Sequence, residues 1–295
     1  DELKFKNIYY KDEDKRFELK SFKALGGAFA VYKIASEKKN ITVSTATAGN
    51  HGRSVAWGAQ RLGLKCKIFI SEFVSESRAE AMRNLDAEVI RVKGNYDNSL
   101  KECIEQSNKN NWEIVQDVSW EGYKEVPKLI MAGYTIMVKE IIDEINKNSI
   151  THVFLQAGVG GMAAAMIAGF AKLSENIPQF IIIEPENADC VFQSIKNNKP
   201  TTVDIKKETV MGGMSCGDVS SIAWEILKNS ANYCLTIPDE AISTAVALLA
   251  EKRLSNKKII GGECAVPGVI ALIGSFNNKE YLDKLELNEQ SNVLL

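Results

Sequence analysis

The sequence is organised around the stretch Ser21-Phe22-Lys23-Ala24-Leu25-Gly26-Gly27-Ala28-Phe29-Ala30. Apolar residues at helical spacing predict a helix over 24–35, and residues 8–17 indicate a strand that ends in a charged turn. Lys23 is therefore expected at a strand-to-helix junction. A lysine whose amine is partly desolvated there can act as a nucleophile towards carbonyls. The alternative is an ordinary surface lysine at a helix start, so other stretches must decide between the two.

Outward from this stretch, strand and helix patterns alternate to the end of the chain. Strands are expected over 41–45, 65–70, 88–92, 113–116, 151–155, 179–183, 233–236 and 293–295, and helices over about 54–62, 75–85, 95–110, 126–148, 161–173, 191–197, 223–227 and 239–254, with one more beginning near 260–265. This alternation predicts an α/β fold with mainly parallel sheets flanked by helices. We expect two interwoven lobes, a large one from 1–40 and 151–295 and a small one from 41–150.

Composition excludes several classes of function. The chain of 295 residues is 45% hydrophobic and 25% charged, with a net charge of −2, so no basic field favours nucleic acid. No apolar run is long enough to span a bilayer, so no membrane partner is expected, and the start does not resemble a signal peptide. The two histidines have no zinc-site spacing, so neither a metal site nor a Ser-His-Asp triad is expected.

The six cysteines are widely spaced and form no CxxC pair. This pattern favours free thiols in the cytosol over a disulfide framework. A single local bridge between Cys190 and Cys216 remains open at this stage.

The loop Gly158-Val159-Gly160-Gly161 follows a predicted strand and precedes a predicted helix. Glycines let backbone amides approach an anion, and a helix N-terminus adds partial positive charge, so this geometry suits a phosphate. The loop matches neither the Walker pattern nor a clean dinucleotide fingerprint. A tight turn that needs glycine only for packing explains it equally well.

Two other turns carry polar side chains after strands. In Ala48-Gly49-Asn50-His51-Gly52, Asn50 can bind a ring hydroxyl or simply cap a helix, and His51 can move protons or be structural. Asp117 lies at the carboxyl end of a predicted strand, where open α/β sheets bind their ligands. It can hold a cationic amine, transfer a proton or cap a helix.

Taken together, these motifs resemble the fold type II pyridoxal-phosphate enzymes. The motifs SFKALGG, AGNHGR, QDVSWEGY, QAGVGG, EPENADC and GGECA occur in that family's order, across nearly the whole chain. DVSWEGY and EPENADC are most similar to the diaminopropionate ammonia-lyases. GNHG and the glycine loop are shared by the whole group and discriminate little.

The resemblance implies a role for each matching residue. Lys23 would form the Schiff base with pyridoxal 5′-phosphate and move the α-proton, Phe22 would stack by the pyridine ring, and Asn50 would bind the 3′-oxygen of that ring. The phosphate would be held by Gly158, Val159, Gly160 and Gly161. Asp117 would be catalytic and contact the substrate amine, and the substrate would also face Thr45, Thr47, Ala48 and Gly49. The larger lobe would carry most of the cofactor site. The implied reaction is α,β-elimination of 2,3-diaminopropionate to pyruvate and ammonia.

Three features depart from the family's pattern. Ala48 stands where these lyases have an aspartate that takes the α-proton of the D-isomer, so the resemblance implies that the L-isomer is favoured. The connection between Asn40 and Ile41 is shorter than usual. The chain also begins at Asp1 without methionine and stops at Leu295 in a predicted strand, so we expect a fragment.

Two other functions remain open. An alanine before GNHG also resembles L-serine and L-threonine dehydratases, and a degenerate member of the family could serve as a binding protein without catalysis. A binding protein has no chemical need for Lys23, which favours an enzyme. As a family member the protein is expected to be a cytoplasmic homodimer acting on a small amino acid, and neither nucleic acid nor membrane is expected as a partner.

Overall fold

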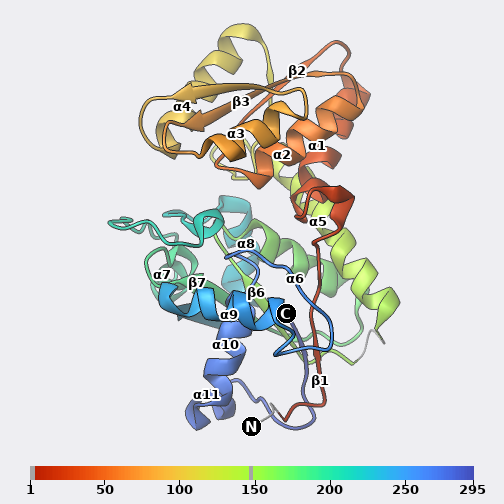
Figure 1. The fold of residues 1–295 in the computed structure, drawn as a ribbon, viewed down its shortest axis with the longest axis vertical. Helices are drawn as coiled ribbons and strands as arrows, with labels where there is room; N and C mark the ends of the chain where they lie inside the picture. Colours follow the sequence, from red (N-terminus) through yellow and green to blue (C-terminus); the bar gives the residue numbers. More distant parts are fainter. Residues whose placement is uncertain (1–3, 146–148) are drawn as a thin grey trace. The chain divides into compact units, whose positions relative to one another are not determined.

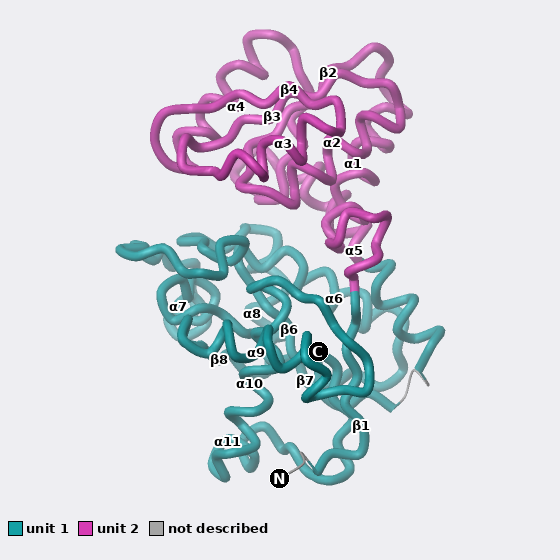
Figure 2. Tube along the Cα trace, viewed as in Figure 1, with its two compact units in different colours: residues 1–12, 135–295 teal, residues 13–134 magenta. Residues whose placement is uncertain are grey.

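A computed structural model describes residues 4–145 and 149–295 of the chain, which fall into two compact units (Figure 2). Residues 1–12 and 135–295 form the large unit, and residues 13–134 form the small unit. The unit boundaries differ from the expected lobe boundaries near residues 40 and 150. Residues 23–37 and 125–134 pack within the small unit, because glycines bring their helices into close contact with the rest of it.

The small unit is a parallel sheet with helices around it (Figure 1). Its strands are β2 (Thr42–Ala46), β3 (Lys65–Ser71), β4 (Glu88–Val92) and β5 (Glu113–Ile114), and its helices are the short 3-10 turn η1 (Arg16–Glu18), α1 (Lys23–Glu37), α2 (Asn50–Arg61), α3 (Glu76–Arg83), α4 (Tyr96–Asn110) and the first part of α5 (Glu125–Glu144). The sheet order is β4-β3-β2-β5, and all three strand pairs are parallel.

Helices cover both faces of this sheet, as successive residues of β3 demonstrate. Ile68 packs near Gly52 of α2, whereas Phe69 packs in a buried cluster with Cys103 of α4. Neighbouring residues of a strand point to opposite faces, so α2 and α4 lie on opposite sides of the sheet. Burial on both faces explains why β2 and β3 are nearly continuous buried runs.

Helix α1 approaches two other helices closely because its first turns are built from small residues. A Cβ on Gly26 would lie 2.4 Å from Cε1 of Tyr134 on α5, and a Cβ on Gly27 would lie 2.0 Å from Oγ of Ser54 on α2. Only glycine permits these distances, so the Gly26-Gly27 pair fixes how α1, and with it Lys23, is seated in the small unit.

The large unit contains a second parallel sheet, of order β1-β9-β6-β7-β8. Its strands are β1 (Asn7–Tyr9), β6 (His152–Gln156), β7 (Gln179–Pro185), β8 (Tyr233–Ile237) and β9 (Asn292–Leu294), its helices are α6 (Gly161–Leu173), α7 (Cys190–Lys196), α8 (Ser221–Ser230), α9 (Ile242–Ala250), α10 (Pro267–Phe276) and α11 (Lys279–Lys284), and its 3-10 turns are η2 (Gly212–Met214) and η3 (Asp239–Ala241). The first and last strands of the chain pair with each other, Ile8 opposite Val293.

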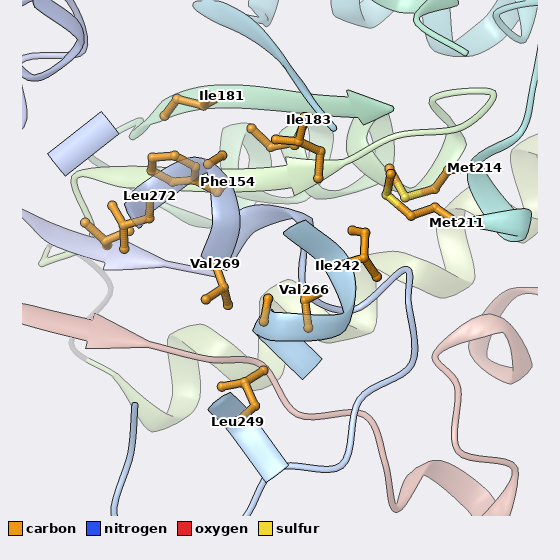
Figure 3. Packing of buried hydrophobic residues seen from close by; sticks show 14 of the residues in the cluster. Phe154, Ile181, Ile183, Met211, Met214, Ile242, Leu249, Val266, Val269 and Leu272 are labelled. Atoms are coloured by element: carbon orange, nitrogen blue, oxygen red, sulfur yellow. The ribbon is translucent and has the colours of Figure 1, made fainter. Parts of the chain in front are cut away.

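Buried side chains on opposite faces of β7 define the core of the large unit. Ile181 and Ile183 pack with residues of α9 and α10, such as Leu249 and Leu272 (Figure 3). On the other face, the ring of Phe180 lies 6.0 Å from that of Phe170 on α6. Both faces of β7 are therefore covered, which is the arrangement that a run of buried β-branched residues predicts.

The expected fold class is confirmed: the protein is α/β, with parallel sheets flanked by helices. The expected strand over 88–92 matches β4, and most other elements agree within a few residues. The helix expected over 239–254 ends earlier, at Ala250, and helix α11 was not predicted. The helix expected over 126–148 corresponds to α5, which ends at Glu144. Residues 146–148 lie outside the described part of the chain.

One expectation is wrong. Lys23 does not lie at a strand-to-helix junction, because β1 ends at Tyr9, and a loop with the turn η1 separates it from α1. The charged residues that suggested the end of a long strand instead form this connection, in which Arg16 makes an ion pair with Glu13.

We predict that Gly26→Ala destabilises the protein by about 1–3 kcal/mol, because the added methyl group overlaps Tyr134 and the carbonyl of Ile130, 2.6 Å away. Gly274→Ala is the matched control, since Gly274 is an exposed position of α10 with nothing within 4 Å. That change should be neutral or stabilise by up to about 1 kcal/mol. Urea denaturation measures both, and equal midpoints for the two variants would contradict the close packing of α1.

Candidate active site

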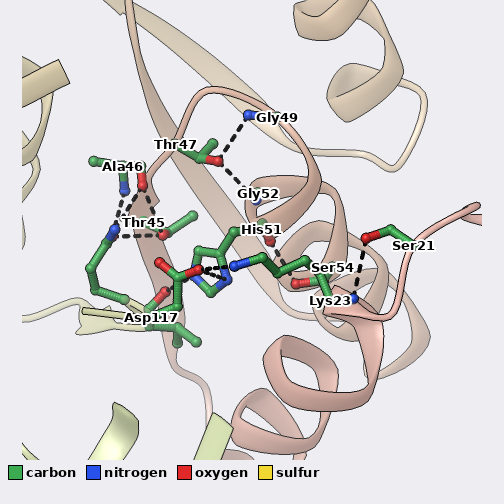
Figure 4. A network of polar contacts seen from close by, with 12 residues as sticks. Ser21, Lys23, Thr45, Ala46, Thr47, Gly49, His51, Gly52, Ser54 and Asp117 are labelled. Atoms are coloured by element: carbon green, nitrogen blue, oxygen red, sulfur yellow. Dashed lines mark hydrogen bonds and ion pairs between the residues drawn. The ribbon is translucent and has the colours of Figure 1, made fainter. Parts of the chain in front are cut away.

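Lys23 and Asp117 form an ion pair in the small unit (Figure 4). Lys23 is the first residue of α1, and its Nζ donates to Oδ2 of Asp117 at 2.6 Å. The Lys23 side chain is 27% exposed and that of Asp117 is 16% exposed. The fold thus brings together the two residues that the sequence nominates as catalytic, and leaves the amine partly accessible to a ligand.

The carboxyl of Asp117 remains ionised in this setting. Burial on its own would raise the pKa of Asp117, but the positive charge that His51 carries when it is protonated, and the Lys23 ammonium, which also donates a hydrogen bond, lower this pKa below its ordinary value. Charge-assisted hydrogen bonds of this kind favour the ionised form of a carboxylate. The small unit therefore holds a paired positive and negative charge beside α1.

Aromatic rings stand beside the amine of Lys23. Phe22 packs edge-on against Tyr134, with ring centroids 5.0 Å apart, and Nζ of Lys23 lies 5.7 Å and 6.0 Å from the two ring centroids. Tyr134 is buried on α5, and burial raises the pKa of its phenol. The rings supply an apolar surface on one side of an otherwise charged pair.

The turn after β2 is held by a threonine hydroxyl. Oγ1 of Thr47 accepts from the amides of Gly49 at 3.0 Å and Gly52 at 3.2 Å. Ala48 is exposed and its carbonyl accepts from Nη1 of Arg78 at 3.4 Å. Asn50 is the first residue of α2 and is exposed, and its Oδ1 accepts from Nη1 of Arg53 at 3.5 Å.

Thr45 is buried more deeply than the other nominated substrate residues, although Thr47 is also buried. Its side chain is fully buried, and its hydroxyl donates to Oε1 of Gln116 at 2.9 Å. Oε1 of Gln116 also accepts from the backbone amide of Ala46, and Nε2 donates to the carbonyl of Ala46 and to the hydroxyl of Tyr96, at 2.7 Å. In this structure the hydroxyl of Thr45 therefore serves the packing of β2 against the residues that lead to Asp117.

The glycine loop belongs to the large unit and connects β6 to α6. A Cβ on Gly158 would lie 3.0 Å from Sγ of Cys216 and 3.1 Å from the carbonyl oxygen of Gly213. Gly160 has φ of +86° and would place a Cβ 2.7 Å from Cδ1 of Leu227. The loop thus requires glycine both for its conformation and for close approach, at the N-terminus of a helix of 13 residues.

A buried carboxyl lies behind this loop. Glu184, near the end of β7, is fully buried and accepts from the amides of Val191 at 2.9 Å and Phe192 at 2.7 Å. Burial raises the pKa of Glu184 to about 8. Sγ of Cys190 lies 3.7 Å from Oε1 of Glu184 and 3.6 Å from the carbonyl oxygen of Gly158, so it connects the carboxyl with the loop.

All six cysteines are free thiols in the structure, including Cys190 and Cys216. Within residues 4–145 and 149–295, no group of three or more His, Cys, Asp or Glu side chains is arranged to hold a metal ion. None of the helices in the same residues has the length and hydrophobicity needed to span a membrane.

The nominated residues divide between the two units. Phe22, Lys23, Thr45, Thr47, Ala48, Gly49, Asn50 and Asp117 lie in the small unit, whereas Gly158, Val159, Gly160 and Gly161 lie in the large unit. Sequence reasoning missed Tyr134, Gln116 and Glu184. The last two fall inside motifs that were already noted, QDVSWEGY and EPENADC, but Tyr134 sits in a long helix with no signal of its own.

Comparison with known proteins gives consistent results. Residues 1–292 match the family of pyridoxal-phosphate dependent enzymes. The chain is 34% identical to diaminopropionate ammonia-lyase from Escherichia coli over 98% of its own length and 79% of that relative. It is 24% identical to L-threonine dehydratase from Staphylococcus epidermidis, over 89% of this chain and 65% of that one.

The fold agrees as closely with a solved structure. A crystal structure of the Escherichia coli diaminopropionate ammonia-lyase, in complex with an aminoacrylate-PLP azomethine reaction intermediate, superposes with a TM-score of 0.91. It is 34% identical, and the match covers 99% of this chain and 79% of that one.

We predict that Lys23→Met lowers the stability of the cofactor-free protein at pH 7 by at least about 1 kcal/mol, because Asp117 loses its partner. Since the pKa of Asp117 is lower in the folded protein than in the unfolded chain, its stabilising contribution is present above about pH 4 and is lost as the pH falls further. The stability difference between wild type and variant should therefore shrink in acid, as urea denaturation at several pH values can measure.

The matched control is Lys38→Met, which breaks the pair between Lys38 and Glu113 in the same unit. That pair is similar in length, 2.7 Å, but the lysine is 56% exposed. Its loss should cost less than about 1 kcal/mol. An equal effect of the two variants, or a Lys23→Met effect that is independent of pH, would contradict the assigned charges.

Proposed function

This chain belongs to the pyridoxal-phosphate dependent enzymes, and we propose that it catalyses the α,β-elimination of 2,3-diaminopropionate to pyruvate and ammonia. The single observation that carries the proposal is the ion pair of Lys23 and Asp117 at the start of α1. It places a primary amine and a carboxylate, the two groups that this elimination requires, in one partly exposed position. The lyase from Escherichia coli, at 34% identity over nearly the whole chain, supports the choice of substrate.

The residues of this chain fit pyridoxal 5′-phosphate. Lys23 offers an accessible amine to the aldehyde, Phe22 an aromatic surface, and Asn50 an exposed amide group. The backbone of Gly158 to Gly161 offers a glycine-lined helix N-terminus, which suits a phosphate. When bound, the cofactor supplies an electron sink for the carbanion formed at the substrate's α-carbon.

The protein's own groups then have distinct tasks. Nζ of Lys23 would take the α-proton of the substrate, because its amine is partly exposed and is a base once it is neutral. The carboxylate of Asp117 binds the ammonium group on the β-carbon. Because this group already carries its protons, it departs as ammonia when the C–N bond breaks. The hydroxyl of Thr47 accepts from the amides of Gly49 and Gly52, so it fixes the turn after β2, beside which we place the substrate carboxylate.

Ala48 supports a preference for the L-isomer. Its methyl group has no proton to give or take, so nothing at position 48 can remove the α-proton from the face opposite Lys23. We therefore propose that L-2,3-diaminopropionate is the better substrate.

We further propose that the protein works as a cytoplasmic homodimer. Six free thiols in one chain are typical of a reducing compartment. Phe29 and Tyr32 on α1 are exposed aromatic residues of the small unit, 38% and 56% accessible, which suits burial against a second copy.

We predict that the wild-type protein releases pyruvate from L-2,3-diaminopropionate much faster than from the D-isomer. Lys23→Ala should lower turnover of the L-isomer by at least about 10³-fold, since it removes the base and the cofactor's attachment. A coupled pyruvate assay with added pyridoxal 5′-phosphate measures each rate. Faster turnover of L-serine or L-threonine than of L-2,3-diaminopropionate would identify a dehydratase instead.

A second prediction concerns position 48. Ala48→Asp should raise turnover of the D-isomer by about 10²- to 10⁴-fold, the range that a placed general base contributes. Ala48→Asn is the matched control, because it has the same size and no titratable proton. If the asparagine variant gains as much as the aspartate variant, or if wild type uses both isomers equally, the role assigned to Ala48 is wrong.

A further inference from the structure

His51 is a buried imidazole whose two nitrogens have different surroundings. It is 5% exposed, and Nε2 lies 2.8 Å from the carbonyl oxygen of Val115. A carbonyl oxygen can only accept, so Nε2 carries the hydrogen in this contact. Any proton that His51 gains or loses is therefore gained or lost at Nδ1.

Nδ1 of His51 points to the Lys23 and Asp117 pair. It lies 3.6 Å from Oδ2 of Asp117, which is the same oxygen that accepts from Nζ of Lys23 at 2.6 Å (Figure 4). At 3.6 Å this contact is too long for a hydrogen bond, and Nδ1 is buried without a hydrogen-bond partner among the described residues. One carboxylate oxygen thus stands between a lysine ammonium and an imidazole nitrogen with an open lone pair.

The charges around His51 decide its protonation. Burial lowers the pKa of His51, Asp117 after β5 raises it, and the Lys23 ammonium on α1 lowers it again. Tyr134 on α5 contributes a neutral phenol beside Lys23. While Lys23 is charged, the carboxylate is already matched and a second buried cation is unfavourable, so His51 is neutral.

We propose that Lys23, Asp117 and His51 form a proton relay, in which the proton lost by the Lys23 ammonium passes through Asp117 to Nδ1 of His51. An ammonium has no lone pair, so Lys23 must lose a proton before it can attack a carbonyl. The transfer turns the pair of ammonium and neutral imidazole into a neutral amine and an imidazolium. The total charge is unchanged, and Asp117 keeps a cation beside it throughout.

In this role His51 does not touch the substrate. It acts through Asp117 and sets whether Lys23 is charged or neutral. The inference rests on the proposed function only in assuming that Lys23 reacts with a carbonyl. The carbonyl of Val115 contributes by fixing the tautomer, because it keeps the hydrogen on Nε2 and leaves Nδ1 free to accept.

The chain contains only two histidines, which makes the test direct. Histidine ¹⁵N NMR of the cofactor-free protein resolves the tautomer and the charge of each ring. His152 in the large unit is the internal control. It is also buried, and its Nε2 donates to a backbone carbonyl, that of Leu285, at 2.8 Å. Lys23→Met represents the state in which residue 23 is neutral.

We expect wild-type His51 to be neutral at pH 7 with its hydrogen on Nε2. In Lys23→Met its titration midpoint should rise by about one pH unit or more, with the added proton on Nδ1, while His152 is unchanged. Adding Asp117→Asn should cancel the rise. Lys23→Gln provides a second neutral side chain if Lys23→Met does not fold.

A His51 midpoint that does not change in either Lys23 variant would overturn the relay. A wild-type hydrogen on Nδ1, or a rise that persists after Asp117→Asn, would do the same. The measurement uses neither cofactor nor turnover, so it can fail while the elimination is observed, and it can succeed if the protein acts on another amino acid.

Discussion

The ion pair between the Lys23 ammonium and the Asp117 carboxylate is the interaction on which the chemistry of the small unit depends. The two residues are 94 positions apart in the chain, and they meet because α1 is seated closely against its neighbours and the segment that follows β5 places Asp117 beside its first residue. A largely buried carboxylate without a cation would be costly, so the fold and the reactive amine stabilise each other. His51 adds a second basic group next to the same oxygen.

Glycine serves two separate purposes in the two units. In α1, Gly26 and Gly27 have no positive φ; they are needed because other helices approach where a methyl group would be. In the large unit, Gly160 does have a positive φ, and Gly158 faces the backbone of Gly213 and Met214. The first use positions a side chain, whereas the second exposes backbone amides that can bind an anion.

Much of this could be predicted from sequence, for physical reasons that differ between elements. Strand β4, for example, holds three β-branched apolar residues between clear turns, and separate motifs single out Lys23 and Asp117 as candidate catalytic residues without predicting that they pair. The position of α1 could not be predicted, because it depends on contacts with Tyr134 and Ser54 that are distant in sequence. The surroundings of Nδ1 of His51 and the raised pKa of Glu184 could not be predicted either, because both result from burial in the folded protein. Local patterns therefore indicated which residues are chemically relevant, but not which of them share one oxygen.

The most direct test of the account is to identify the amine that holds the cofactor. The protein would be mixed with pyridoxal 5′-phosphate, reduced with borohydride and digested, and the labelled peptide would be sequenced by mass spectrometry. We expect a single stoichiometric label on Lys23, which is lost in Lys23→Met. A stoichiometric label on another lysine, or no label on Lys23 in folded protein, would contradict it.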